Sequence, residues 1–217
     1  MKSLKHEIRI LGIDDGPFSK SIKSCQVLVV GTLYRGGNFM DGLLSTKIQK
    51  DGDDSTEKLV PMINNSKFRS QIRCIMIDGI ALGGFNVIDI KKLFQKTKIP
   101  VLCVIRKMPN LNRIEKAISH VNNAEKKWNL IKSSPQIKKI SDMYCQWVGM
   151  DEEKVIQIIR LSTICGQVPE PLRIAHIIAS GIVSGESKGG GMIFNYFVFD
   201  LTVIISRIFL FSVKNAL

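Results

Sequence analysis

Two aspartates stand where apolar runs typical of β-strands come to an end. Asp14 follows the run 8–13, and Asp78 follows the run 73–77. If these two strands are neighbours in one sheet, their carboxyl ends bring both carboxylates within a few ångströms of each other. Carboxylate oxygens are the ligands that Mg²⁺ prefers, and a bound Mg²⁺ can activate water and clamp a phosphoryl oxygen. The pair therefore predicts a metal site, and a simple turn role for each aspartate is the alternative.

A third acidic ligand is expected between the third predicted strand and the helix that follows it. The candidates are Asp53, Asp54 and Glu57, and Asp54 is the one that we assign to the metal. The cluster has no downstream Glu at the spacing of an EF-hand, so a calcium loop is not indicated. Helix capping, with acids that complement the helix dipole, is the alternative role.

A histidine and an arginine share one helix in the second half of the chain. His176 follows Arg173 by three residues near the start of an amphipathic helix predicted over 171–183. Residues three apart lie on one face of a helix. A cation and an imidazole on one face suit charge stabilisation and proton transfer at a scissile phosphate. The alternative is an ordinary packed or solvated helix histidine.

The elements that must position these residues follow a readable order. The runs 8–13, 25–34 and 39–49 predict three antiparallel strands joined by turns. The later segments are predicted as a helix from 55 to 66, a strand over 73–77, a helix over 87–96, a strand over 101–105, and helices from 112, over 152–161 and over 171–183. This order predicts an α/β fold with a mixed sheet flanked by helices. No G-x-G-x-x-G or P-loop motif occurs, so no nucleotide cofactor is expected.

The composition favours a polyanionic partner. The 217 residues include 31 Lys and Arg against 19 Asp and Glu, a net charge of +12, and 45% are hydrophobic. This hydrophobic fraction excludes a wholly disordered chain, and the charge suits nucleic acid or an anionic membrane surface, with solubility alone as the alternative. The five cysteines are scattered with no C-x-x-C pair, which argues against a disulfide framework and a zinc knuckle. Because no signal peptide precedes the domain, a cytoplasmic protein is expected.

The end of the chain differs in composition from the rest. We expect a globular domain over 1–188 and an appendage over 189–217, which opens with three glycines. The segment 192–213 is long and apolar enough to span a membrane, but it contains Asp200 and Arg207. Each such charge costs about 2.5–3.5 kcal/mol near a bilayer centre. A membrane contact is therefore expected only through this segment, if at all.

Several motifs resemble endonuclease V, and they occur in the order found in that family. They are Gly12-Ile13-Asp14, Ile77-Asp78-Gly79, the strand from Ile99 to Arg106, Val148-Gly149, and the most specific one, Val-Pro-Glu-Pro-Leu-Arg-Ile-Ala-His at 168–176. The resemblance covers nearly all of 7–186. A still closer similarity is to an uncharacterised archaeal family related to endonuclease V, through Asp78-Gly79-Ile80, Gly84-Phe85-Asn86-Val87 and Gly185-Glu186-Ser187.

The resemblance implies a ribonuclease H-like fold and a metal-dependent phosphodiesterase site. In this site Asp14 and Asp78 bind Mg²⁺ or Mn²⁺, and His176 assists by moving a proton or binding a second metal. Positively charged groups that contact phosphate would be Arg106 or Lys107, and Arg173.

The chain also departs from the endonuclease V pattern. The Glu of the family's Phe-Arg-Glu segment has no counterpart apart from Asp51–Asp54 and Glu57, and the Pro-Tyr-Ile-Pro wedge that reads a deaminated base is absent. Inosine recognition is therefore not expected. The leading hypothesis is a metal-dependent nuclease acting on DNA or RNA. The alternatives are a non-catalytic nucleic-acid-binding protein with the same fold, and a basic module tethered to a membrane by its tail.

Overall fold

The computed structural model describes residues 6–187, apart from residues 20 and 23. The predicted appendage 189–217, with its possible membrane segment, lies outside the described residues. Within the described part of the chain, none of the helices combines the length and the apolar character that a bilayer crossing requires.

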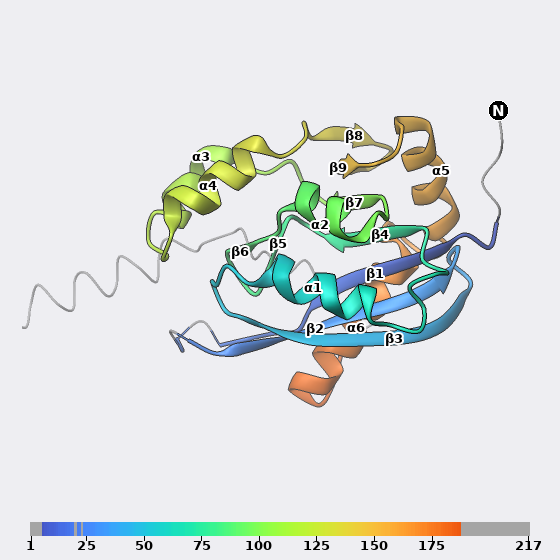
Figure 1. The fold of residues 1–217 in the computed structure, drawn as a ribbon, viewed down its shortest axis with the longest axis horizontal. Coiled ribbons are helices and arrows are strands. Elements are labelled where there is room, and N and C mark those ends of the chain that lie inside the picture. Colours follow the sequence, from blue (N-terminus) through green and yellow to red (C-terminus); the bar gives the residue numbers. More distant parts are fainter. Residues whose placement is uncertain (1–5, 20, 23, 188–217) are drawn as a thin grey trace, which may run out of the picture.

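A central seven-stranded sheet has the order β3-β2-β1-β4-β7-β9-β8 (Figure 1). The strands β1, β4 and β7 are parallel to one another, and the neighbours on both sides are antiparallel. The bounds are Arg9–Asp15 (β1), Gln26–Arg35 (β2), Phe39–Gln49 (β3), Cys74–Asp78 (β4), Val101–Ile105 (β7), Lys138–Ile140 (β8) and Met143–Val148 (β9). A separate two-stranded hairpin consists of β5 (Ala81–Leu82) and β6 (Asn86–Val87).

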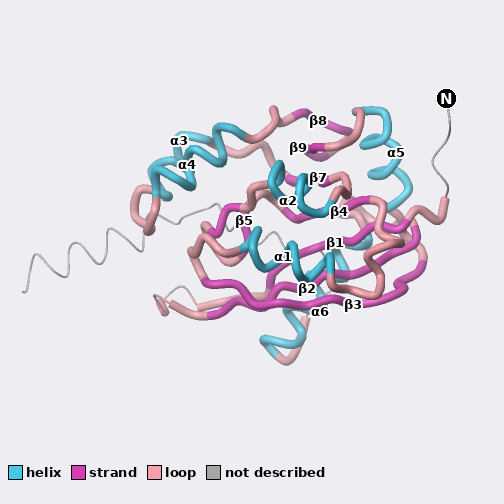
Figure 2. Tube along the Cα trace, in the orientation of Figure 1, coloured by secondary structure: helices cyan, strands magenta, loops and turns pink. Residues whose placement is uncertain are grey.

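Helices cover both faces of the sheet (Figure 2). They are α1 (Ser55–Asn64), α2 (Ile90–Thr97), α3 (Leu111–Ile118), α4 (Ala124–Ser133), α5 (Glu152–Ser162) and α6 (Glu170–Ser184). Apolar residues of α1 and α2 pack on one face, and those of α5 and α6 pack on the other. We call these the α1–α2 face and the α5–α6 face. The helices α3 and α4 form a separate pair that packs around Phe85.

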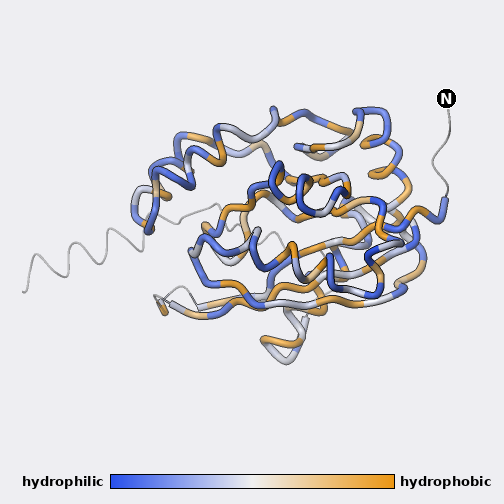
Figure 3. The backbone as a smooth tube through the Cα atoms, viewed as in Figure 1, coloured by the Kyte–Doolittle hydropathy of each residue, from blue (hydrophilic) through white to orange (hydrophobic). Residues whose placement is uncertain are grey.

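The central strands are apolar along their whole length because both of their faces are buried. In β4, Cys74 and Met76 pack on the α5–α6 face, whereas Ile75 and Ile77 pack on the α1–α2 face. The strands accordingly form the hydrophobic centre of the molecule in Figure 3. Burial raises the pKa of Cys74 to about 12, so this cysteine is a packed thiol rather than a reactive thiolate.

The predicted order of elements is confirmed, with three differences, of which the first is the unpredicted hairpin of β5 and β6. The helix predicted from 87 begins at Ile90, because Asp89 accepts a hydrogen bond from the Lys92 N–H as its N-cap and Asn86–Val87 pair as β6. The hairpin of β8 and β9 occupies 138–148, where no strand is predicted. It extends the sheet beyond β7 by antiparallel pairing.

Candidate active site

Asp14 and Asp78 lie side by side at the carboxyl ends of two adjacent strands. The parallel strands β1 and β4 are paired up to Ile13 opposite Ile77, so the next residue of each strand is one of the two aspartates. Neighbouring strands are about 4.8 Å apart. The predicted adjacency of the first and fourth strands is therefore confirmed, and it brings the two carboxylates together.

Both aspartates point to the α5–α6 face. Successive residues of a strand alternate between faces, and residues two apart share one. Met76 packs on the α5–α6 face, and a side chain at Gly12 would point directly at Pro171 of α6. Asp14 follows Gly12 by two residues and Asp78 follows Met76 by two, so both share that face.

Close packing of α6 on β1 delivers His176 to this pair. A Cβ atom at Gly12 would lie 2.4 Å from the backbone carbonyl carbon of Pro171, so only glycine allows this approach. The Thr32 hydroxyl donates a hydrogen bond of 2.6 Å to the Pro171 carbonyl oxygen. Further along α6, His176 Nδ1 lies 3.0 Å from Asp14 Oδ2.

Arg106 completes the group from the next strand. In the sheet Asp78 is opposite Val104, and Arg106 follows Val104 by two residues, so it shares the same face. Arg106 Nη2 lies 3.1 Å from Asp78 Oδ2. Four of the residues predicted for the site, namely Asp14, Asp78, Arg106 and His176, are thus brought together.

Burial and mutual repulsion control the protonation of this group. The pKa of Asp14 is well above 3.8, first because burial removes its hydration and second because of the negative charge of Asp78. Burial also raises the pKa of Asp78, against the opposing charges of Arg106 and His176. Burial lowers the pKa of His176 below 6.5, so its imidazole is neutral at neutral pH. Two carboxylates that repel each other when ionised favour a cation between them.

The donor set fits a small divalent cation. Mg²⁺ is usually held by one or two protein carboxylates together with waters and substrate phosphate oxygens. Asp14 and Asp78 supply such a pair. Among residues 6–187 with their two gaps, no three or more His, Cys, Asp and Glu side chains form a ready cage for a metal ion.

Asp15 is a candidate that the sequence patterns do not single out. Its Oδ2 accepts a hydrogen bond of 3.0 Å from the Gly83 N–H, and its own N–H donates to Asp14 Oδ1 at 2.8 Å. Burial raises its pKa, and the charge of Asp14 raises it further. In the sequence, the pair Gly83-Gly84 indicates a tight turn after Asp78. In the structure these glycines have φ of +55° and +88°. Asp15 fixes this turn beside the site.

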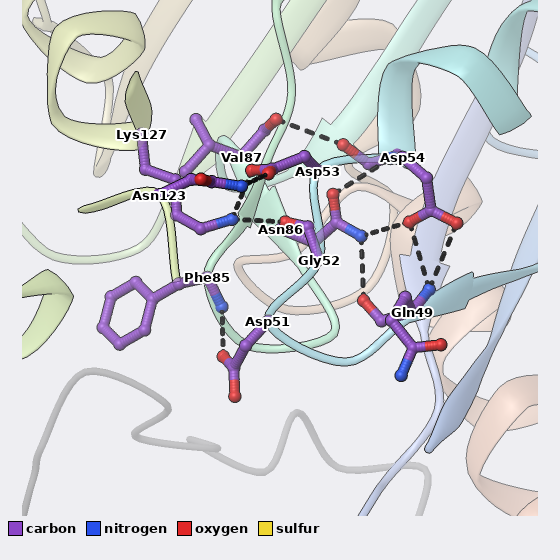
Figure 4. A network of polar contacts seen from close by, with 11 residues as sticks. Gln49, Asp51, Gly52, Asp53, Asp54, Phe85, Asn86, Val87, Asn123 and Lys127 are labelled. Carbon is purple, nitrogen blue, oxygen red and sulfur yellow. Dashed lines mark hydrogen bonds and ion pairs between the residues drawn. The ribbon is translucent and has the colours of Figure 1, made fainter. Parts of the chain in front are cut away.

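The acidic cluster before α1 makes local contacts instead (Figure 4). Asp54 Oδ1 accepts hydrogen bonds from the Gln49 N–H at 3.1 Å and from the Asn86 side-chain amide at 2.6 Å. Asp54 therefore ties the end of β3 to β6.

The two other acids considered for the metal have basic partners. Asp53 forms an ion pair of 2.5 Å with Lys127 of α4, and Glu57 forms one of 2.7 Å with Lys92 of α2. For the residues that the structure describes, the contacts of Asp53, Asp54 and Glu57 thus join them to β3, β6, α4 and α2. None of them leads to Asp14 or Asp78.

Arg173 lies apart from the group of four, whereas Lys107 directly follows one of its members. Arg173 Nη2 is 2.6 Å from Glu170 Oε2, and its charge acts on Tyr34. Tyr34 is opposite Ile10, which is four residues, or about 13 Å, before Asp14 along β1. Lys107 is exposed directly after Arg106.

Comparisons with known proteins agree with this architecture. The family model described as Endonuclease dU matches residues 6–183. A UPF0215 protein of Methanothermobacter thermautotrophicus is 44% identical over 192 residues, which cover 87% of this chain and 94% of that protein. A crystal structure of an Archaeoglobus fulgidus protein has a TM-score of 0.75 at 40% identity and covers 80% of this chain and 97% of that chain.

More distant similarity connects the fold to endonuclease V. The catalytic domain of human endonuclease V has a TM-score of 0.52 at 14% identity, with 82% of each chain covered. Endonuclease V of Ciona intestinalis, in complex with a 24mer DNA containing an inosine followed by a ribo-adenosine, has a TM-score of 0.51 at 13% identity, covering 80% of this chain and 84% of that chain. At such identity the likeness shows the fold alone, and the predicted ribonuclease H-like α/β fold is confirmed. The family match and the close archaeal relatives together show that the chain belongs to the endonuclease dU family, an archaeal family related to endonuclease V.

Proposed function

We propose that this protein is a metal-dependent nuclease that hydrolyses phosphodiester bonds in nucleic acid. The observation that carries the proposal is the pair of Asp14, which is buried, and Asp78, which is half-buried, on adjacent parallel strands, with His176 3.0 Å from Asp14. The description of the matching family as an endonuclease supports it. So does the DNA bound to the Ciona endonuclease V, which makes DNA the first substrate to test.

In this proposal Asp14 and Asp78 hold Mg²⁺ or Mn²⁺ through their carboxylates. Such a cation, when bound, supplies Lewis-acid stabilisation of the charge that develops on phosphate oxygens. Arg106, 3.1 Å from Asp78, orients that carboxylate and places a fixed positive charge beside the scissile phosphate. Lys107 and Arg173 are the further proposed phosphate contacts. For Arg173 this role requires exchange of its Glu170 partner.

His176 is suited to proton transfer. With Asp14 ionised, the neutral imidazole donates its Nδ1–H to Asp14 and leaves Nε2 unprotonated. Nε2 lies 3.5 Å from the Ser180 hydroxyl. We therefore assign to Nε2 the acceptance of a proton from the attacking water, with Asp14 holding the ring in the required tautomer.

A cleavage assay tests the proposal directly. Labelled single-stranded and double-stranded DNA and RNA are incubated with the protein in Mg²⁺ or Mn²⁺, and in parallel in EDTA. We expect cleavage with metal and none in EDTA. Cleavage that persists in EDTA would contradict the metal-dependent site, and binding without cleavage in either metal would favour the non-catalytic alternative.

The effect of metal on stability should depend on pH in a defined direction. Because the folded-state pKa values of Asp14 and Asp78 are raised, the metal-free fold binds protons more tightly than the unfolded chain does. The contribution of these two groups to the free energy of unfolding of the metal-free protein therefore falls as the pH rises through the folded-state pKa values. Metal binding requires the ionised carboxylates, so the increase in Tm caused by Mn²⁺ should grow between about pH 5 and pH 8.

The comparison with and without Mn²⁺ removes the separate effect of His176. Its lowered pKa destabilises the fold as the pH drops below 6.5, whether or not metal is present in the buffer. Thermal unfolding in Mn²⁺ and in EDTA at each pH gives the difference. An increase in Tm that is independent of pH, or that remains undiminished in Asp78→Asn, would contradict the assignment.

A further inference from the structure

The helices α3 and α4, with the connection before them, form a basic arm beside the site. We define the arm as residues 106–133, which contain seven Lys and Arg residues against two Glu residues. In Figure 1 the arm lies at the end of the molecule where β5 and β6 are found, and its helices are mainly hydrophilic in Figure 3.

A short chain connection links the arm to the two site aspartates. Asp15, next to Asp14, holds the Gly83 N–H at 3.0 Å. Phe85, two residues further on, is buried in the apolar centre of the arm with Ile114 and Ile118. Two residues span at most about 7 Å, so one tight turn contacts both the site and the arm.

The arm is fixed to the body of the protein rather than merely tethered. Lys127 of α4 is almost fully buried, and its Nζ donates to the Gly52 carbonyl oxygen and to Asp53 Oδ1, both at 2.5 Å (Figure 4). Asn123 also donates to Asp53. The turn that precedes α1 thus holds α4 through an ion pair and hydrogen bonds. A surface fixed in this way loses little conformational freedom when it binds a ligand.

The outer side of α3 presents positive charge. Ile114 and Ile118 face inwards, whereas Arg113 and Lys116, three residues apart, are exposed on one side of the helix. Within the described residues neither side chain takes part in an ion pair. Lys107, which directly follows Arg106 and precedes α3, is a third exposed positive charge.

The chemistry of this surface fits a duplex backbone better than a single strand. Single-strand binding surfaces stack bases on exposed aromatic rings. Among the described residues, the only large aromatic side chain that is mostly exposed is Phe39. Phe39 is opposite Arg35, which is opposite Arg9 at the start of β1, so it lies at the other end of the sheet from Asp14. The one tryptophan of the arm, Trp128, is partly buried around Phe85, so the exposed cations of α3 are the groups suited to contact phosphates.

From these observations we propose that the arm binds the phosphate backbone of double-stranded DNA through Arg113 and Lys116, next to the Asp14–Asp78 site. The identity of the ligand rests on the proposed function. The location of the surface rests on the arm's fixation, its charge and the turn that it shares with the site.

The test compares two pairs of substitutions that change the net charge equally. Arg113→Gln with Lys116→Gln neutralises the arm, whereas Arg160→Gln with Lys96→Gln is the matched control. Both control residues lie outside the arm. Lys96 is in the last turn of α2, before the amino end of β7. Arg160 is in the last turn of α5, and the end of that helix lies beside the turn between β2 and β3. All four side chains are exposed, so both proteins should fold normally.

Binding is measured by fluorescence anisotropy of a labelled DNA duplex in EDTA, over a range of salt concentrations. We expect the arm pair to lower the slope of log Kd against log salt by about 2, since each phosphate contact contributes about 0.9. At moderate salt this variant should bind about tenfold or more weakly, and the control within about twofold of the unsubstituted protein. Equal effects of the two pairs, or tighter binding of single-stranded DNA or duplex RNA than of duplex DNA, would overturn the proposal.

Failure of this inference can be distinguished from failure of the proposed function. EDTA prevents metal-dependent cleavage, so the binding experiment does not require an active nuclease. Arm-specific loss of binding in a protein that cleaves nothing would refute the nuclease and support the arm. Metal-dependent cleavage, with binding that is unaffected by substitution of Arg113 and Lys116, would support the nuclease and refute the arm.

Discussion

Asp14→Asn should abolish metal-dependent cleavage while leaving the fold intact. We expect the rate of the cleavage step to fall by at least about 10³-fold, because the substitution removes half of the carboxylate charge available to the cation. The amide also cannot hold His176 Nδ1–H as an ionised carboxylate does. Single-turnover cleavage of labelled DNA in Mn²⁺ measures this effect.

The same variant should be no less stable than the unsubstituted protein in EDTA. The Asp14 carboxylate is buried and is repelled by Asp78, and both effects disfavour its ionised form. A neutral amide of the same shape removes that repulsion. Urea unfolding in EDTA measures the stability, and Asp142→Asn, at an exposed position between β8 and β9, is the control for a lost aspartate. Cleavage by Asp14→Asn at the rate of Asp142→Asn would contradict the assigned site.

Gly12→Ala should damage both stability and activity through the packing of α6. The new Cβ would lie 2.4 Å from the backbone of Pro171, and backbone cannot move aside as a flexible side chain can. Overpacking of this kind costs about 1–3 kcal/mol or more in the free energy of unfolding. Because α6 carries His176, its displacement should also lower the cleavage rate by about 10–100-fold, as for the loss of a residue that orients a metal ligand.

Gly181→Ala in the same helix is the matched control. A Cβ at Gly181 would meet no atom within 4 Å. Alanine favours the helix over glycine by about 0.5–1 kcal/mol, so this variant should be slightly more stable and equally active. Urea unfolding and the DNA cleavage assay give both quantities. If Gly12→Ala and Gly181→Ala behaved alike, the close contact between β1 and α6 would not position the site.

The adjacency of Asp14 and Asp78 could be predicted because it follows from simple periodicity. Each residue ends an apolar run, and parallel neighbours bring such ends to one edge of the sheet. The same alternation places Arg106 on their face, two residues after Val104. The Pro-Glu-Pro-Leu-Arg-Ile-Ala-His segment singles out His176, and Pro171 of this segment packs against Gly12.

Other features depended on contacts that spacing does not reveal. Asp15 points away from Asp14 and contacts Gly83, 68 residues later, in a hairpin too short to give a periodic signal. Arg173 shares the first turns of α6 with His176. Its guanidinium, however, donates a hydrogen bond to Glu170, three residues before it. Asp54 is held by the local geometry of Gln49 and Asn86, which composition cannot show. Local competition for charged groups therefore decides which of several plausible acids and bases reach the site.

We propose above all that Asp14 and Asp78 together hold a divalent cation. The most direct measurement is a crystal structure of the protein soaked in Mn²⁺, with anomalous diffraction data to locate the metal. We expect an anomalous peak within about 2.2 Å of a carboxylate oxygen from each aspartate, with water completing the coordination. The Asp78→Asn crystal, treated in the same way, should lose this peak. A Mn²⁺ ion found elsewhere in the protein, with no peak between Asp14 and Asp78, would contradict the account.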